Sequence, residues 1–218
     1  MKSKDTKYII DHFNELLDRY GVSEKAVGWP KKRNLLRYKI LIENFNLNKN
    51  KKILDFGCGL GHFNLYLKRM NIDVQYEGVD INQRLVDSAI KEQPDINIRC
   101  FDAFQAGFNK KYNYIVSCGV HNSKISDNIS FIEDTFHLFN KYATDGFSMN
   151  FLSSKVDYIN KNNFHVSPSK IIELAMQFSN NILLRHDYMP YEFSIIVIKN
   201  CKTIDNLNIF EKYRKFIT

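Results

Sequence analysis

The sequence predicts an α/β protein built on a mostly parallel β-sheet with helices on both faces. Short runs rich in β-branched and aromatic residues alternate with segments of helical apolar spacing from residue 52 to residue 178. Two further strand patterns lie close together around Pro190, so one strand must run antiparallel, and we expect it at the edge of the sheet. The length of 218 residues fits one domain with short appendages.

Two helical segments precede the first strand. Residues 6–20 carry apolar side chains at helical spacing, and Gly21 suits the end of that helix. Residues 31–46 follow Pro30, which favours a helix start, and show the same spacing. The chain therefore divides into a helical cap at 1–50, the sheet domain at 51–200 and a tail at 201–218 that we expect to pack as a helix.

The sheet domain contains seven strand patterns. A helix that joins two parallel strands returns the chain to the same edge of the sheet, so the carboxyl ends of these strands lie together. Strands are predicted over 52–56, 73–79, 96–101, 112–118, 146–152, 181–188 and 192–199. Helices are predicted over 61–70, 83–93, 129–141 and 168–178.

The composition is that of a globular protein, with 44% hydrophobic and 25% charged residues. We expect a cytoplasmic protein without a membrane segment, because no apolar run reaches ~18 residues and no apolar signal region opens the chain. The net charge of +7 permits an anionic partner, but the basic residues are dispersed, which favours a solvated surface. The four cysteines form no CxxC pair, so free thiols and no metal site are expected.

The most informative segment follows the first strand. Asp55 closes that strand, and glycines then occupy alternate positions, at Gly57, Gly59 and Gly61. Glycines permit a sharp turn and let a ligand approach the backbone closely. The next helix begins at this turn and presents its positive end to the ligand.

This segment resembles the first motif of the class I S-adenosylmethionine-dependent methyltransferases. It departs from the dinucleotide fingerprint GxGxxG, because His62 replaces the final glycine. The resemblance extends over about residues 20–200. It implies a Rossmann-like class I methyltransferase fold, with a seven-stranded sheet and one antiparallel edge strand. It also implies S-adenosylmethionine as cofactor and S-adenosylhomocysteine as product.

Acidic residues also follow the second and third strands. Asp80 lies about 20 positions beyond the glycines, where a carboxylate suits the ribose hydroxyls. By the resemblance, Asp102 accepts from the adenine amino group, with Ala103 or Phe104 near the ring. Each acid alone could be a helix cap. The expected cofactor-binding residues are Asp55, Gly57, Cys58, Gly59, Gly61, Asp80, Ile81, Asp102, Ala103, Phe104, Cys118, Gly119, Arg37 and Trp29.

Two of these residues belong to the helical cap and have open alternatives. Trp29, the only tryptophan, could cover the cofactor, stack on a sugar or simply pack the cap on the core. Arg37 could clamp the cofactor's carboxylate or face solvent on its helix.

A hydroxyl or ammonium acceptor must lose a proton, usually to His, Asp or Glu. His121 follows the fourth strand and is the first candidate for the base, while His186 and Asp187 are the second. All of them could instead be surface or capping residues. The chain also resembles a bacterial subgroup with a recurrent Gly-Trp, here Gly28-Trp29, and a His-Asp-Tyr before Glu-Phe. That subgroup is often met among cell-surface saccharide genes.

We therefore expect methyl transfer to O or N of a small polar acceptor of the saccharide type, by a monomer or homodimer. One alternative is an RNA methyltransferase acting on ribose or base. The segment Cys-Gly-Val-His-Asn at 118–122 lacks the Asp/Asn-Pro-Pro-Tyr motif typical of exocyclic base methylation, but this leaves ribose and ring-carbon methylation open. A second alternative is a protein that binds the cofactor without turnover. A dehydrogenase is the remaining class, and His62 argues against it.

Overall fold

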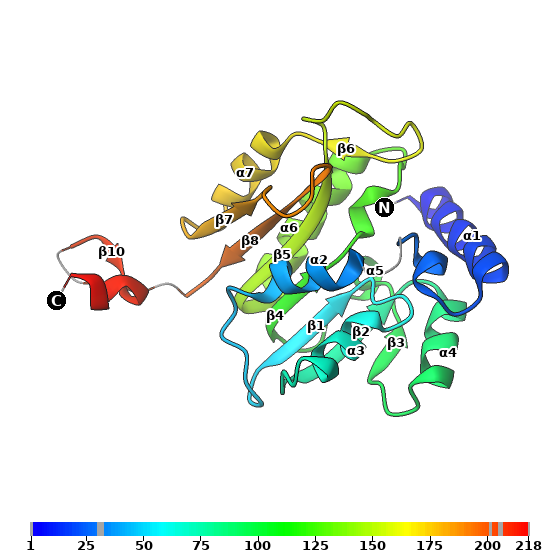
Figure 1. The fold of residues 1–218 in the computed structure, drawn as a ribbon, viewed down its shortest axis with the longest axis horizontal. Helices are drawn as coiled ribbons and strands as arrows, with labels where there is room; N and C mark the ends of the chain where they lie inside the picture. Colours follow the sequence, from blue (N-terminus) through cyan, green and yellow to red (C-terminus); the bar gives the residue numbers. More distant parts are fainter. Residues whose placement is uncertain (1, 30–32, 201, 205–206, 218) are drawn as a thin grey trace.

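The computed structural model describes residues 2–29, 33–200, 202–204 and 207–217. Within them, a twisted sheet lies between two layers of helices (Figure 1). The strands are β1 (Lys52–Phe56), β2 (Gln75–Asp80), β3 (Ile98–Cys100), β4 (Tyr112–Ser117), β5 (Ala143–Ser153), β6 (His165–Val166), β7 (Ile182–Arg185) and β8 (Glu192–Ile198). Their order across the sheet is β3-β2-β1-β4-β5-β8-β7, and the short β6 pairs with the end of β5.

The expected seven-stranded, mostly parallel sheet is confirmed, with β6 as an addition. Strands β1 to β5 are parallel to one another. Strand β8 is antiparallel to β5 and also to β7, so it lies one position in from the edge. The edge strand β7 runs in the common direction, because the crossover between β5 and β7 returns the chain to the same end of the sheet. The hairpin around Pro190 then reverses the chain into β8.

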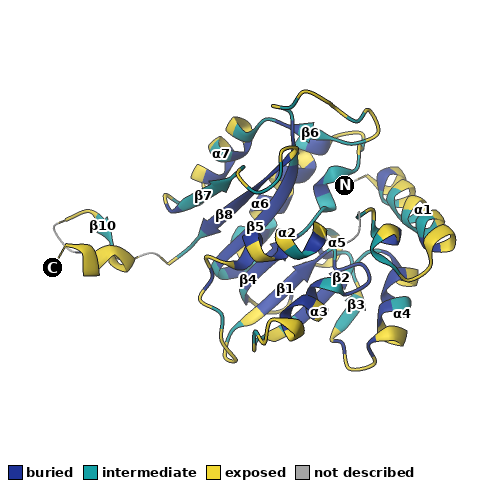
Figure 2. Cartoon of the chain, viewed as in Figure 1, coloured by how far each residue is buried: buried dark blue, intermediate teal, exposed yellow. Residues whose placement is uncertain are grey.

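Helices cover both faces of the sheet, as predicted. Those with more than one turn are α1 (Ser3–Tyr20), α2 (Arg33–Ile42), α3 (His62–Arg69), α4 (Gln83–Glu92), α6 (Asn128–Tyr142) and α7 (Pro168–Met176), and α5 (Ala103–Ala106) is a single turn. Helices α2 and α3 bury Leu41 and Phe63 against one face. Helices α6 and α7 bury Phe136 and Ile171 against the other. Figure 2 shows the central strands buried between these layers. No helix in the described part of the chain is long and apolar enough to cross a membrane.

Helix α1 is fastened to the loops that follow two strands of the sheet. The Nδ2 of Asn82, just after β2, donates to the carbonyl of Ile10 at 3.2 Å and to Asn14 Oδ1 at 3.1 Å. Asp5 at the start of α1 accepts from the backbone N–H of Ser126, beyond β4, at 3.2 Å. Because both loops lie at the carboxyl ends of their strands, α1 spans that end of the sheet.

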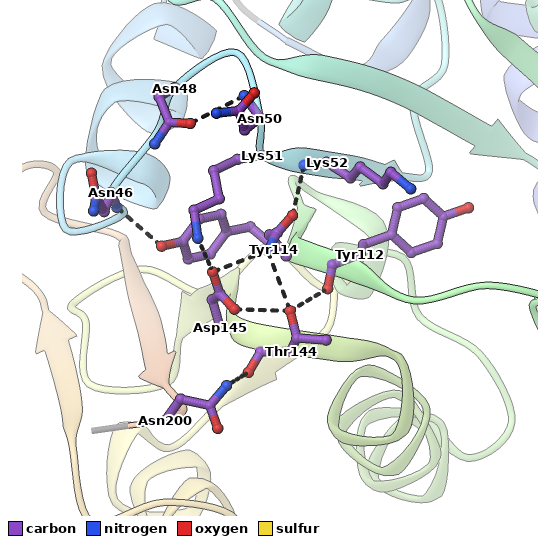
Figure 3. Close-up of polar contacts among 11 residues, drawn as sticks. Asn46, Asn48, Asn50, Lys51, Lys52, Tyr112, Tyr114, Thr144, Asp145 and Asn200 are labelled. Atoms are coloured by element: carbon purple, nitrogen blue, oxygen red, sulfur yellow. Dashed lines mark hydrogen bonds and ion pairs between the residues drawn. The ribbon is translucent and has the colours of Figure 1, made fainter. Parts of the chain in front are cut away.

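The opposite, amino end of the sheet is held by a polar network around Asp145 in β5 (Figure 3). Its carboxylate accepts from Lys51 Nζ at 2.6 Å, from Thr144 Oγ1 at 2.8 Å and from Asn113 Nδ2 at 3.1 Å. These contacts join the starts of β1, β4 and β5. The network is therefore a structural fastening, at the end of the sheet away from the loops that follow Asp55 and Asp80.

The tail differs from the expected helix. It contains β9 (Thr203–Ile204), β10 (Ile209–Phe210) and a 3-10 helix, η3 (Glu211–Phe216). Asn208 takes a left-handed conformation at φ 55°, which favours a turn, and Ile209 then pairs with Ile204. Only six residues remain for η3, too few for a stable α-helix on their own. Elsewhere the element boundaries differ from the predictions by a few residues, and residues 31 and 32 lie outside the described part.

Candidate functional site

A cavity of about 870 Å³ opens at the carboxyl ends of β1 to β4, beneath α1. The positions of Asp55, Asp80 and Asp102 in the sequence predicted that these side chains would converge here, and all three line the cavity. The expected cofactor-binding residues that line it are Trp29, Asp55, Gly57, Cys58, Gly59, Asp80, Ile81, Asp102, Ala103, Phe104, Cys118 and Gly119. Of the expected set, Gly61 and Arg37 lie outside its wall.

The glycine turn forms one wall of the cavity. Gly57, Gly59 and Gly61 all have left-handed φ values, of 78°, 51° and 70°. A Cβ at Gly57 would lie 2.2 Å from Val120 Cγ2, and one at Gly61 would lie 2.4 Å from Ile96 Cδ1. Glycine is therefore required at these positions both by backbone conformation and by packing. The Gly57 and Cys58 N–H groups donate to Val79 O at 2.8 and 3.0 Å, so the turn is tied to β2.

Asp80 locks the same turn from the neighbouring strand. Its Oδ2 accepts from the Gly59 N–H at 2.8 Å, and its Oδ1 accepts from the Asn82 N–H at 2.8 Å. Burial raises the pKa of this carboxyl above its usual value, and the backbone N–H groups of Asn82, Gly59 and Ile81 oppose the rise. A carboxylate oxygen has two lone pairs, so Asp80 keeps acceptor capacity toward the cavity.

Asp55 is the most perturbed acid in the cavity wall. It is 3% exposed and accepts a hydrogen bond from Tyr76 OH at 2.9 Å. Burial raises the pKa of Asp55 to about 7, and the nearby carboxyl of Asp80 adds to this rise. A bound cation beside Asp55 would favour its ionised form, so this wall suits a ligand with a positive group.

The far side of the cavity is aromatic. Asp102 caps α5, because its side chain accepts from the Phe104 N–H at 3.0 Å. The alternative that Asp102 is a helix cap is therefore correct. The same residue also lines the cavity. Phe101, Phe104 and Phe131 lie in the same wall, with the Phe104 and Phe131 ring centroids 5.5 Å apart. Flat apolar surfaces beside a polar acceptor provide what a purine ring needs.

Trp29 follows the 3-10 helix η1 (Glu24–Val27) and lies against the turn after β4. A Cβ at Gly119 would be 2.3 Å from Trp29 Cζ2, so the indole can pack here only because residue 119 is glycine. The guanidinium of Arg37 lies over the indole at 4.1 Å from the ring centroid. Trp29 thus separates the cavity from Arg37.

Arg37 does not face solvent, so that alternative is corrected, and it lies outside the cavity wall, so its role toward the cofactor's carboxylate remains a prediction that this arrangement does not favour. It is 5% exposed, and its Nε and Nη2 donate to Glu192 Oε2 at 2.8 and 2.5 Å. The sequence could not reveal this pair, because its partners are 155 positions apart.

The structure also corrects the expected placement of His121. Its ring is 2% exposed and lies between Phe131 and Phe151, with centroids at 5.0 and 5.3 Å. Neither ring nitrogen has a hydrogen-bond partner among the described residues. Burial lowers the pKa of His121 to about 3, so the ring is neutral at ordinary pH. The short 3-10 helix η2 (Val120–Asn122) turns this side chain back into the core and gives Val120 to the cavity.

The second pair of candidate catalytic residues also lies outside the cavity wall. His186 packs edge-on against Phe193, with centroids 5.9 Å apart. Asp187 is exposed and accepts from Arg185 Nε at 2.8 Å. The base role of His121, His186 and Asp187 therefore remains a prediction that this arrangement does not favour.

Several cavity residues were missed from the sequence. Ile9, Phe13 and Val27 come from α1 and η1, Tyr38 from α2, and His137, Lys141 and Tyr142 from α6. In the sequence, the helical spacing of the apolar residues in these segments indicated only that the helices pack on the core. The mixed polar and aromatic surface at the end of α6 was the one available signal for a ligand-facing segment.

The fold and the cavity together provide a polar and aromatic crevice at the carboxyl ends of a parallel sheet, where ligands bind in folds of this kind. Residues 38–132 match the model of the methyltransferase small domain. A Mycobacterium tuberculosis protein with a provisional methyltransferase name is 27% identical over 157 residues, which cover 67% of this chain and 92% of that protein.

Solved structures agree in fold. Magnesium protoporphyrin IX methyltransferase from Synechocystis, with bound S-adenosylhomocysteine, superposes with a TM-score of 0.65 at 13% identity, over 90% of this chain and 100% of that one. A methyltransferase from Archaeoglobus fulgidus gives a TM-score of 0.60 at 15% identity, over 87% and 100% of the two chains. The chain is thus similar to methyltransferases in sequence and shares the fold of structures solved with S-adenosylhomocysteine, in line with the resemblance of its glycine turn.

Proposed function

We propose that the protein transfers the methyl group of S-adenosylmethionine to an oxygen or nitrogen atom of a small polar acceptor. One observation carries this proposal: Asp55, Asp80 and Asp102, from the ends of three neighbouring strands, line a single cavity bounded by a glycine turn. The residues fit the cofactor's parts in order along that wall. A structural neighbour from Synechocystis was solved with S-adenosylmethionine bound, which supports the same cofactor here.

The cofactor-binding roles follow from the chemistry of each residue. Asp80 offers carboxylate lone pairs to the ribose hydroxyls, and Asp102 with Phe104 offers an acceptor and an apolar face to the adenine. Asp55 gives a negative charge to the ammonium of the methionine part once it is ionised. The glycine turn leaves room for the ligand beside the backbone.

When bound, the cofactor supplies an activated methyl group for an in-line displacement. The chain's own contribution is to position the reactants and exclude water. Helix α1 and Trp29 supply apolar cover over the cavity through Ile9, Phe13 and the indole. Apolar cover of this kind suits a small acceptor.

An RNA methyltransferase is the main alternative, and the net charge of +7 is the observation that favours it. The fastening of α1 across the carboxyl end of the sheet favours a small molecule instead. We propose a cytoplasmic enzyme, monomeric or homodimeric. The free thiols of Cys58, Cys100 and Cys118 support a reducing compartment.

The test uses purified protein with isotopically labelled S-adenosylmethionine. Release of S-adenosylhomocysteine is measured with a panel of sugars and sugar nucleotides and, separately, with total RNA. We expect release with a small acceptor that depends little on salt. Methyl transfer to RNA with a steep salt dependence would favour the alternative. Saturable cofactor binding without release from any acceptor would identify a binding protein without turnover.

A further inference from the structure

A cluster of buried polar side chains lies behind Trp29, on the α2 face of the sheet. We define this polar cluster as Asn34 and Arg37 from α2, Ser148 and Asn150 from β5, and Glu192 and Ser194 from β8; each is at most 5% exposed. Asn150 and Ser194 are paired across the two strands. Nearer the amino ends, Ile196 and Phe45 on the same face belong to the hydrophobic core. The polar cluster lies toward the carboxyl end, where ligands bind in such sheets.

Several atoms of the polar cluster have no hydrogen-bond partner among the described residues. Arg37 Nη1 and Asn150 Nδ2 are donors of this kind, and Glu192 Oε1 and Asn34 Oδ1 are acceptors. Buried polar groups normally have partners, and leaving several unpaired in one place is costly. The orientation of the Asn150 amide is fixed, because its Oδ1 accepts from the Gly119 N–H at 2.7 Å. A ligand that both donates and accepts would satisfy the cluster.

The polar cluster adjoins the cofactor cavity. Gly119, bonded to Asn150, is part of the cavity wall, and so is Trp29, which contacts Arg37. Cys118 lines the cavity as well. Burial raises the pKa of its thiol; the positive charge of Arg37 lowers this pKa, and the negative charges of Glu192 and Asp55 raise it. Trp29 and Gly119 therefore contact both the polar cluster and the cavity.

We propose that the polar cluster is the acceptor subsite and that it takes a neutral, polyhydroxylated ligand of the saccharide class, with Trp29 moving aside to admit it. This inference rests on the proposed function. Arg37 and Glu192 already neutralise one another, so an anionic ligand would meet Glu192 and a cationic ligand would meet Arg37. Hydroxyl groups donate and accept, which matches the mixture of unpartnered atoms. The indole offers an aromatic face to the C–H surface of a sugar ring.

Trp29 is the only tryptophan, so intrinsic fluorescence reports directly on this subsite. Full-length protein is first saturated with S-adenosylhomocysteine, whose binding is measured independently by calorimetry. The probes are the methyl α-glycosides of glucose, galactose and mannose, with glucuronate and glucosamine as charged matches. We expect a saturable change in emission with at least one neutral glycoside, and binding of the charged sugars weaker by about tenfold or more.

Variants separate a ligand-binding role from a structural one. Glu192→Gln should weaken the glycoside response by about tenfold and leave cofactor-product affinity unchanged. Glu173→Gln, an exposed change of the same kind on α7, is the control and should have no effect. If Glu192→Gln does not fold, Asn34→Leu replaces it. That variant removes the unpartnered Asn34 oxygen at similar volume, so it should weaken glycoside binding while cofactor-product affinity stays unchanged.

Failure of the two proposals can be distinguished. Absence of S-adenosylhomocysteine binding would contradict the proposed function itself. Normal binding of that product with no response to any neutral glycoside, or a stronger response to glucuronate or glucosamine, would overturn the acceptor subsite alone. A glycoside response that is unchanged in the folded Glu192 or Asn34 variant would also overturn it.

Discussion

The carboxylate of Asp80 accepts a hydrogen bond from the backbone N–H of Gly59, with 2.8 Å between Oδ2 and N. This contact joins the end of β2 to the glycine turn after β1. It means that the acid expected to hold the ribose also shapes the wall against which the rest of the cofactor lies. Cofactor affinity and the local stability of the turn should therefore depend on the same side chain.

Asp80→Asn should weaken S-adenosylhomocysteine binding by about ten- to a hundredfold, because the loss of a charged acceptor costs ~1.5–3 kcal/mol. The melting temperature should also fall, since an amide NH2 would face one of the two backbone N–H donors. Calorimetry and thermal denaturation measure the two effects. Asp95→Asn, on an exposed loop, is the control and should change neither. Unchanged affinity in the Asp80 variant would remove this residue from the ribose site.

Gly59→Val should abolish measurable cofactor binding. A side chain at φ 51° costs about 1–2 kcal/mol in backbone strain. The new Cβ would also lie 3.0 Å from Val27 Cγ1, so the larger side chain must displace η1 or project into the cavity. Gly21→Ala is the matched control, because Gly21 is also left-handed but nothing lies within 4 Å of its Cβ position. The control should lose some stability and bind normally; equal binding by the Gly59 variant would contradict the loop's role.

Affinity for S-adenosylhomocysteine should rise with pH up to about 7. The pKa of Asp55 is raised to about 7 in the free protein, and a bound ammonium group favours the ionised carboxylate, so binding releases a proton below this pH. Below pH 7 the affinity should increase by up to about tenfold per pH unit, and above it the curve should level off. Calorimetry across pH 5.5–8.5 measures this slope. Asp55→Asn should flatten the profile, and a profile that stays steep would assign the proton to another group.

His121→Phe should stabilise the protein by about 1–3 kcal/mol, because the variant removes two unpartnered buried nitrogens from an aromatic surrounding. Denaturant unfolding measures the change, and cofactor-product affinity should stay the same. Turnover decides the original hypothesis of a base. A large loss of rate in a stable variant that still binds the product would restore His121 to the catalytic machinery.

The cavity wall formed by β1 to β3 was predictable from the sequence because it depends on strand ends. Parallel strands bring their carboxyl ends to one edge, so Asp55, Asp80 and Asp102 had to converge once the alternating pattern was recognised. Trp29 also reached the cavity as expected, although its contact with Gly119 could not be foreseen.

The acceptor half was not predictable in the same way. His121 stands two positions beyond Gly119, and its orientation depends on how η2 turns, which the sequence pattern does not specify. Arg37 and Glu192 meet only because α2 lies over β8, a long-range packing relationship. The predicted C-terminal helix differs from the structure for a local reason, because Asn208 takes a left-handed conformation that interrupts the helical spacing. Side-chain direction in short irregular segments therefore limited the prediction.

The central claim is that the cavity at the carboxyl ends of β1 to β4 holds S-adenosylmethionine. A crystal structure of the complex with S-adenosylhomocysteine tests it most directly. We expect the ribose hydroxyls on the carboxylate of Asp80, the adenine beside Phe104 and Asp102, and the amino group near Asp55. Electron density for the nucleoside outside this cavity, or a cavity that stays closed by protein side chains at saturating ligand, would contradict the account.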